Sequence, residues 1–111
     1  MARIRLDKPW QALSAENVAL LAGELGVYQL SDGAGRVIRI GYAGGRSLFG
    51  LRSAIDDARR QHRGAVKFRY EVTMQYLSRY QELLMLHKAD HGTLPEGNAG
   101  ERMTLGRLSP L

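Results

Sequence analysis

The sequence predicts a small α+β domain in which helices flank a three-stranded, mainly antiparallel sheet. Two short apolar runs, at residues 27–30 and 37–40, enclose a glycine-rich turn segment, as in a β-hairpin with a loop of about five residues. Residues 66–72 alternate strictly between apolar and polar side chains, which predicts a third strand with one wet face. Residues 47–61 and 75–91 carry apolar side chains at helical spacing, which predicts two long helices.

The remaining elements are shorter. Residues 2–6 alternate and predict a short edge strand. Ser14 is a typical helix N-cap, and the apolar spacing that follows it predicts a helix that Gly26 ends. The tail is rich in loop-forming residues and finishes with an apolar piece at 103–108. No linker or internal repeat divides the 111 residues, so we expect a single domain, 1–111.

The composition excludes some kinds of site and indicates where in the cell the protein works. Cysteine is absent, which excludes disulfides and thiolate zinc sites. The first residues lack the apolar core of a signal peptide. No apolar run approaches the roughly 20 residues that span a bilayer, so no membrane partner is indicated. We therefore expect a cytoplasmic protein.

Positive charge gathers in the middle of the chain. Between Arg36 and Arg69 there are nine basic residues and two acids, a net charge of +7 against +5 for the whole chain. Such an excess suits a phosphate-rich partner, because Lys and Arg displace condensed counterions. It suits a solvated basic surface equally well. The residues that we expect to contact nucleic acid are Arg39, Arg46, Arg59, Arg60 and Arg63.

Two motifs flank the predicted hairpin, Gly26-Val27-Tyr28 in its first strand and Arg39-Ile40-Gly41 in its second. With the ordered Arg52, Glu82 and Asn98 that follow, they resemble the signature of the GIY-YIG nuclease superfamily. The run from Ile40 to Arg52 is similar to a poorly characterised bacterial branch of that family with a degenerate second motif. The resemblance covers about residues 26–98, which would form the core behind an N-terminal helical extension.

The resemblance implies metal-dependent phosphodiester hydrolysis of nucleic acid, DNA more than RNA. In that family a glutamate holds a divalent ion, so Glu82 would bind Mg²⁺, while Arg52 would contact the phosphate. Tyr28 would orient or activate the nucleophile, and Asn98 would take a supporting polar role. These residues, with Tyr42, are the candidate catalytic set of a Mg²⁺-dependent endonuclease.

The second motif departs from the family pattern, because Arg39 stands where a tyrosine is expected. Arginine cannot act as a base, since its pKa is above about 12. Tyr42 lies three residues later, and alternation places it on the opposite face of a regular strand from Arg39. Only a bulge or bend around Gly41 would return Tyr42 to the site.

Plainer interpretations stand beside each assignment. Glu82 is either a solvated glutamate or a group at the edge of a sheet-facing cleft, and Tyr28 is either catalytic or packing in the core. His87 and His91 have the i, i+4 spacing of a metal pair, without an evident third ligand. The chain could therefore be a catalytically inactive nucleic-acid-binding module of the same fold. A structural or protein-interaction domain is the third alternative.

Overall fold

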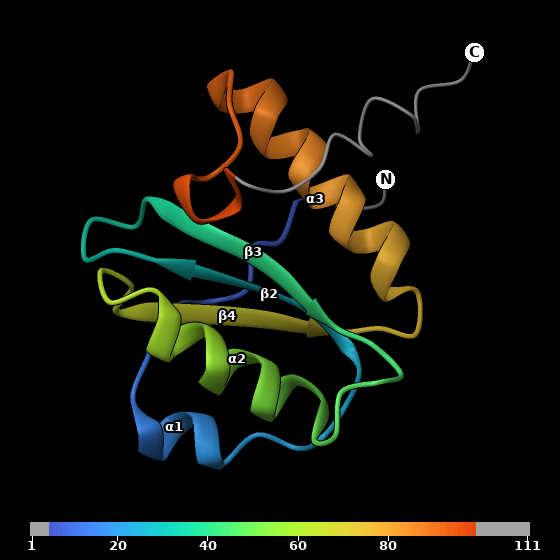
Figure 1. Cartoon of the computed structure of the whole chain (residues 1–111). Helices are drawn as coiled ribbons and strands as arrows, with labels where there is room; N and C mark the ends of the chain where they lie inside the picture. The colour runs from blue at the N-terminus through green and yellow to red at the C-terminus, as the bar shows by residue number, and fades with distance from the viewer. Residues whose placement is uncertain (1–4, 100–111) are drawn as a thin grey trace.

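The computed structural model describes residues 5–99, which form a four-stranded sheet with helices on both faces (Figure 1). The strand order is β1-β4-β2-β3, and all neighbouring strands are antiparallel. The strands are β1 (Gln11–Ala12), β2 (Gly26–Ser31), β3 (Val37–Ala43) and β4 (Lys67–Val72). The helices are α1 (Ala15–Ala19), α2 (Gly50–Gln61) and α3 (Tyr76–His91), followed by a short 3₁₀ turn, η1 (Glu96–Asn98).

The sheet lies between α1 and α2 on one face and α3 on the other (Figure 1), and a hydrophobic core lies on each side of it. On one face, α2 and α1 cover a cluster made of Val18, Leu21, Tyr28, Leu30, Ile38, Ala43, Leu51, Ile55, Ala58, Ala65 and Phe68. On the other face, α3 covers Leu6, Val27, Ile40, Tyr80, Leu83 and Leu84. β2 lies between β4 and β3 and is buried along its whole length. Burying each large apolar side chain contributes roughly 1.5–3 kcal/mol, so the two-sided burial of β2 fixes the sheet between the helices.

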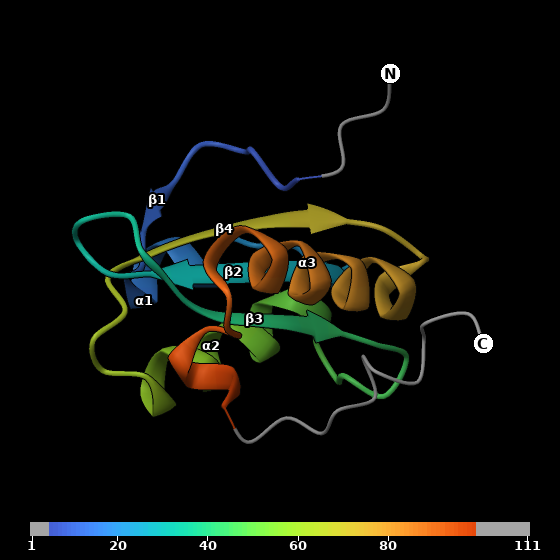
Figure 2. The same cartoon turned by 90° about the horizontal axis from the view of Figure 1, so that it is seen from above.

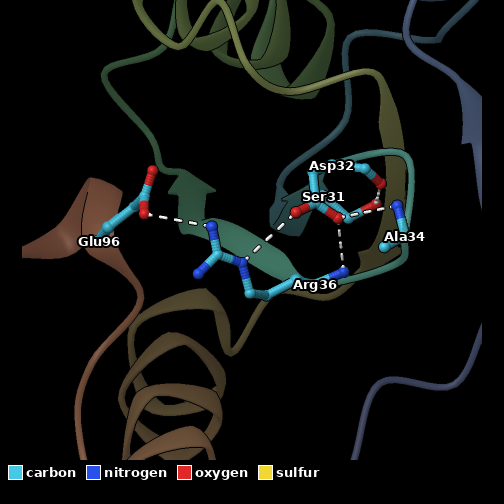
Figure 3. Close-up of polar contacts among 5 residues, drawn as sticks. All are labelled: Ser31, Asp32, Ala34, Arg36 and Glu96. Atoms are coloured by element: carbon cyan, nitrogen blue, oxygen red, sulfur yellow. Dashed lines mark hydrogen bonds and ion pairs between the residues drawn. The ribbon is translucent and has the colours of Figure 1, made fainter.

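The hairpin loop is held by the side chain of Asp32 (Figure 3). Its Oδ1 accepts hydrogen bonds from the backbone N–H groups of Ala34 and Arg36, at 3.0 and 2.9 Å. The Arg36 backbone N–H is the main cause of a lowered Asp32 pKa. The Arg36 guanidinium also bridges Asp32 and Glu96 of η1. The loop is thereby tied to the C-terminal part of the fold.

A bulge in β3 decides which side chains reach which core. Leu30 pairs with Arg39 and Ser31 pairs with Val37, so Ile38 is an extra residue on β3. An extra residue breaks the strict alternation of faces. Ile38 therefore packs on the α2 side, whereas Val37 and Ile40 both pack on the α3 side. Arg39 remains on the α2 side, opposite Leu30.

Most predicted elements are present. The hairpin, the third strand, both long helices and the Ser14 N-cap are confirmed, with the Ser14 hydroxyl accepting from the Asn17 N–H at 3.1 Å. The α+β class is also confirmed, and within the part described no helix is long and apolar enough to cross a membrane.

The number of strands and the length of the first helix were predicted wrongly. The sheet has a fourth strand, β1, while Arg5 and Leu6 are outside any strand and residues 2–4 lie outside the described range. α1 ends at Ala19, well before Gly26, and the Leu20 N–H donates to the Asn17 carbonyl at this end. The carbonyl of Glu24 accepts from Leu51 at 2.8 Å and that of Leu25 from Thr73 at 3.0 Å. The predicted apolar piece at 103–108 also lies outside the described residues.

Candidate anion-binding site

A cavity of about 460 Å³ lies between the sheet and α2. Tyr28 from β2 and Arg39 from β3 line it on the sheet side, and Arg46 lines it from the β3–α2 loop. The remaining lining residues come from that loop and from α2: Ser47, Leu48, Phe49, Ser53, Ala54, Asp57, Ala58 and Gln61. Two arginines, one carboxylate residue (Asp57) and the buried Tyr28 therefore line one hollow, with a net charge of +1.

The Tyr28 ring lies directly on the backbone of β3. Tyr28 pairs with Gly41 across the hairpin. A Cβ atom on Gly41 would stand 2.3 Å from both Cζ and Oη of Tyr28, far inside van der Waals contact. Only glycine leaves room for the ring here, so Gly41 positions the Tyr28 phenol at the cavity.

Arg39 is held in the cavity wall by the C-terminal part of the fold. Its Nη1 donates to the backbone carbonyl of Gly97 at 3.2 Å, and the side chain is half-buried. The pKa of His62 is lowered, chiefly by burial and further by the charge of Arg39. A fixed cation that raises the local potential in this way is suited to an anionic ligand.

Tyr42 lies on the other face of the sheet. It pairs with Val27 while Tyr28 pairs with Gly41, so the register continues without a bulge at this point. The bend around Gly41 that would bring Tyr42 beside Tyr28 is not observed. Tyr42 instead packs against α3, with ring centroids 5.9 Å from Tyr76 and 4.8 Å from Tyr80.

Arg52 lies near the cavity, and Glu82 lies far from it in the fold. The Arg52 guanidinium stacks over Phe49, 5.2 Å from the ring centroid, and Phe49 itself lines the cavity. Glu82 belongs to α3, which covers the opposite face of the sheet from α2 (Figure 1). The sheet therefore stands between Glu82 and the pair formed by Tyr28 and Arg39.

The surroundings of Glu82 do not fit a Mg²⁺ site. Its carboxylate, 44% exposed, accepts from Arg79 Nη1 at 2.6 Å, and Arg79 also makes two hydrogen bonds with Glu71 at 3.1 and 3.0 Å. A cation already neutralises the carboxylate that would bind the metal. The hollow beside Glu82 is lined by residues of α3 alone, among them the exposed Met85, so it is not a sheet-facing cleft. Within residues 5–99, no group of three or more His, Asp or Glu side chains is placed to hold a metal ion.

The side chain of Asn98 is fully buried and forms hydrogen bonds with the backbone of β3. Its Oδ1 accepts from the Ile40 N–H at 2.9 Å, and its Nδ2 donates to the Ile40 carbonyl at 2.8 Å. The carboxamide thus satisfies the backbone N–H and C=O of Ile40 at the outer edge of β3, as a neighbouring strand would. Asn98 lies next to Gly97, so it also fixes the carbonyl that Arg39 contacts.

The predicted basic residues divide into three groups. Arg39 and Arg46 line the cavity. Arg59 and Arg60 both pair with Asp56, whose pKa is lowered mainly by the hydrogen bond from Arg59. Arg63 is exposed and lines a separate hollow with His62. Sequence reasoning missed Phe49, Asp57 and Gln61 as cavity residues, because only the packing of α2 on the sheet shows which part of the helix borders the cavity.

The fold and the cavity define a small α+β protein with a basic hollow on one face of an antiparallel sheet. The chain belongs to the DUF7508 family, described as a domain of unknown function, whose profile matches residues 4–90. No curated protein and no solved structure matches the chain. The family description carries no activity, so any function must be argued from the geometry.

Proposed function

We propose that the protein is a nucleic-acid-binding module that holds a backbone phosphate in the cavity between β2, β3 and α2. The observation that carries the proposal is that Arg39 and Arg46 line one hollow together with Tyr28. Guanidinium groups present paired N–H donors that match phosphate oxygens. The net charge of +5 favours approach of a polyanion.

Arg39 supports binding rather than cleavage. In the resemblance to GIY-YIG nucleases, this position would carry a tyrosine that assists the nucleophile. Arginine adds a permanent positive charge and removes a group that can exchange a proton. Arg39 therefore increases the affinity of this position for phosphate and removes a group that could take part in catalysis. This favours the inactive binding module over the endonuclease.

Salt-dependent binding of short fluorescent oligonucleotides tests the proposal. The logarithm of the binding constant should fall linearly with the logarithm of salt concentration, because bound phosphates release counterions. Arg39→Ala and Arg46→Ala should each reduce that slope by about 1. Arg5→Ala is the matched control, since Arg5 is paired with Asp90 on α3 and lies outside the cavity. Absence of binding at low salt, or equal slopes for all variants, would overturn the proposal.

The same oligonucleotides separate binding from metal-dependent cleavage, the other function that the resemblance implies. Incubation with Mg²⁺ should leave them intact at concentrations where they are bound. Cutting by the wild-type protein that Glu82→Ala abolishes would instead establish the endonuclease. Circular dichroism on each variant would show that loss of function is not loss of fold.

A further inference from the structure

A second hollow lies on the other side of the β3–α2 loop, and aromatic rings line it. Its residues are Tyr42, Gly44, Gly45, Arg46, Ser47, Tyr76 and Leu77. Tyr42 is 41% exposed, although it lies in a strand that is otherwise mostly covered. Its ring is nearly parallel to that of Tyr76, with an interplanar angle of 11°. The two rings are thus offset-stacked, with Tyr42 exposed to solvent and Tyr76 half-buried.

The backbone of the loop fixes this surface in place. The Tyr76 ring packs on Gly44, where a Cβ atom would come within 2.8 Å of Cε1. The Tyr76 hydroxyl accepts from the Gly45 N–H at 3.2 Å. Beneath Tyr42, the buried Tyr80 ring supports it with a centroid distance of 4.8 Å. A platform that is ordered before the ligand arrives loses little side-chain entropy on binding.

Arg46 joins the aromatic surface to the basic cavity. It is exposed and lines both hollows, with Tyr28 and Arg39 on one side and with Tyr42 and Tyr76 on the other. A nucleotide carries a phosphate and a flat base on one short scaffold. Arg46 is common to the two hollows, although Arg39 and the tyrosines lie on opposite faces of the sheet, so a strand that places a phosphate beside Arg46 can place an adjacent base on the tyrosines. In a duplex the bases are paired and stacked, and they cannot reach such a surface without flipping out.

We infer that Tyr42 and Tyr76 form a base-stacking platform and that the protein selects single-stranded over double-stranded nucleic acid. The inference rests on the proposed nucleic-acid function and names its substrate class. The neighbouring cation Arg46 and the net charge of +5 favour a polyanion over an apolar protein segment on this surface. Stacking on aromatic side chains is tolerant of sequence, so base identity should matter little.

The closing experiment compares three ligands of equal length: a single strand, the same strand with abasic sites, and its duplex. The wild-type protein should bind the intact single strand tightest, about tenfold or more above the abasic strand. Tyr42→Ala should weaken binding of the intact strand by about the same factor and leave duplex binding unchanged. Tyr42→Phe, which keeps the ring, should bind as the wild type does. Arg39→Ala should weaken binding of all three ligands, because each contains phosphates.

The outcomes distinguish the two proposals. Equal binding of the intact and abasic strands by the wild-type protein would overturn the platform and leave the phosphate site standing. An equal loss for all three ligands in Tyr42→Ala would also overturn it, because the ring would then act through the fold. No binding of any ligand at low salt would overturn both proposals. The abasic comparison uses the unaltered protein, so it decides the matter even where Tyr42→Ala does not fold.

Discussion

Asn98 pairs with both backbone groups of Ile40, which lies 58 residues earlier in the chain. The contact is buried, and within residues 5–99 it takes the place of a neighbouring strand on the outer side of β3. The resemblance to GIY-YIG nucleases implied a supporting polar role for Asn98 at a catalytic site. Its hydrogen bonds instead hold η1 against β3, and through Gly97 they hold the backbone that Arg39 contacts.

Asn98→Ala should destabilise the fold by about 2–4 kcal/mol, because it leaves a buried N–H and a buried C=O of Ile40 without partners. Urea denaturation followed by circular dichroism measures the effect. Glu96→Ala is the control in the same turn, since its ion pair with Arg36 is on the surface and contributes about 1 kcal/mol or less. Similar losses in the two variants would mean that Asn98 does not support β3 as described.

Gly41→Ala should displace the Tyr28 ring, since the added Cβ would overlap it at 2.3 Å. We expect a loss of about 1–3 kcal/mol from overpacking, together with weaker oligonucleotide binding. The loss should shrink in a Tyr28→Leu background, where the ring is absent. A double-mutant cycle gives the coupling between the two sites.

Gly45→Ala is the matched control for that cycle. The nearest atom to its added Cβ would be the Tyr76 hydroxyl at 3.7 Å, an ordinary contact. Its free energy of unfolding should stay close to that of the wild-type protein. A cycle with no coupling between positions 28 and 41 would contradict the close approach of ring and backbone.

Arg79→Met should be the costly change in the ion network on the α3 face. The Arg79 side chain is 11% exposed and serves two carboxylates, Glu71 and Glu82. Its loss leaves two like charges together, and we expect a destabilisation of about 2–3 kcal/mol, discounted because both carboxylates reach water. Glu82→Gln should cost about 1 kcal/mol or less. Thermal unfolding of the two variants tests this order, and a larger loss for Glu82→Gln would reverse it.

The stability of the protein should fall as the pH drops through the range just below 6.5. Burial, together with the charge of Arg39, lowers the pKa of His62, and burial lowers that of His87. The histidines of the unfolded chain therefore become protonated near pH 6.5, whereas those of the folded protein become protonated only at lower pH. The stabilisation is complete above that pH and declines toward the lower pKa of the folded state.

Urea denaturation between about pH 7.5 and 5.5 measures this dependence, and His62→Gln should flatten it. Asp32, Asp56 and Asp90 have lowered pKa values, so their stabilisation is complete above their ordinary pKa near 3.8 and is constant over this range. An equally steep dependence in His62→Gln would show that His62 does not contribute.

The sequence predicts the elements whose signals are local. The hairpin is recognisable from its turn residues, and α2 and α3 from their helical period, because each pattern is complete within one segment. β1 escapes prediction because two residues carry no period and become a strand only by pairing with β4. α1 is shorter than predicted, and the segment after it contacts α2 and the residue after β4 through the carbonyls of Glu24 and Leu25, contacts that carry no local signal.

The candidate site was predicted only in part, because some of its contacts join segments that are distant in the sequence. Tyr28 and Arg39 could be placed at the hairpin, but their meeting with Arg46 depends on how the β3–α2 loop folds back. An Arg79–Glu82 pair at i, i+3 is visible in the sequence as a helix-surface pattern. The ion pair between Arg79 and Glu71 of β4 is not visible in the sequence, since only the packing of α3 on the sheet brings Glu71 beside Arg79. The burial of Asn98 likewise depends on a contact between distant segments.

In the part of the chain that the structure describes, β1 pairs with Lys67 and Phe68 and so covers part of the outer edge of β4. Farther along, Arg69 donates to the Lys8 carbonyl at 3.3 Å and stacks over Trp10, and the preceding chain runs beside the strand (Figure 2). An uncovered strand edge is a template for pairing with another chain. Residues 5–12 therefore shield the sheet from intermolecular strand addition. A chain shortened to begin at Leu13 should expose that edge and self-associate.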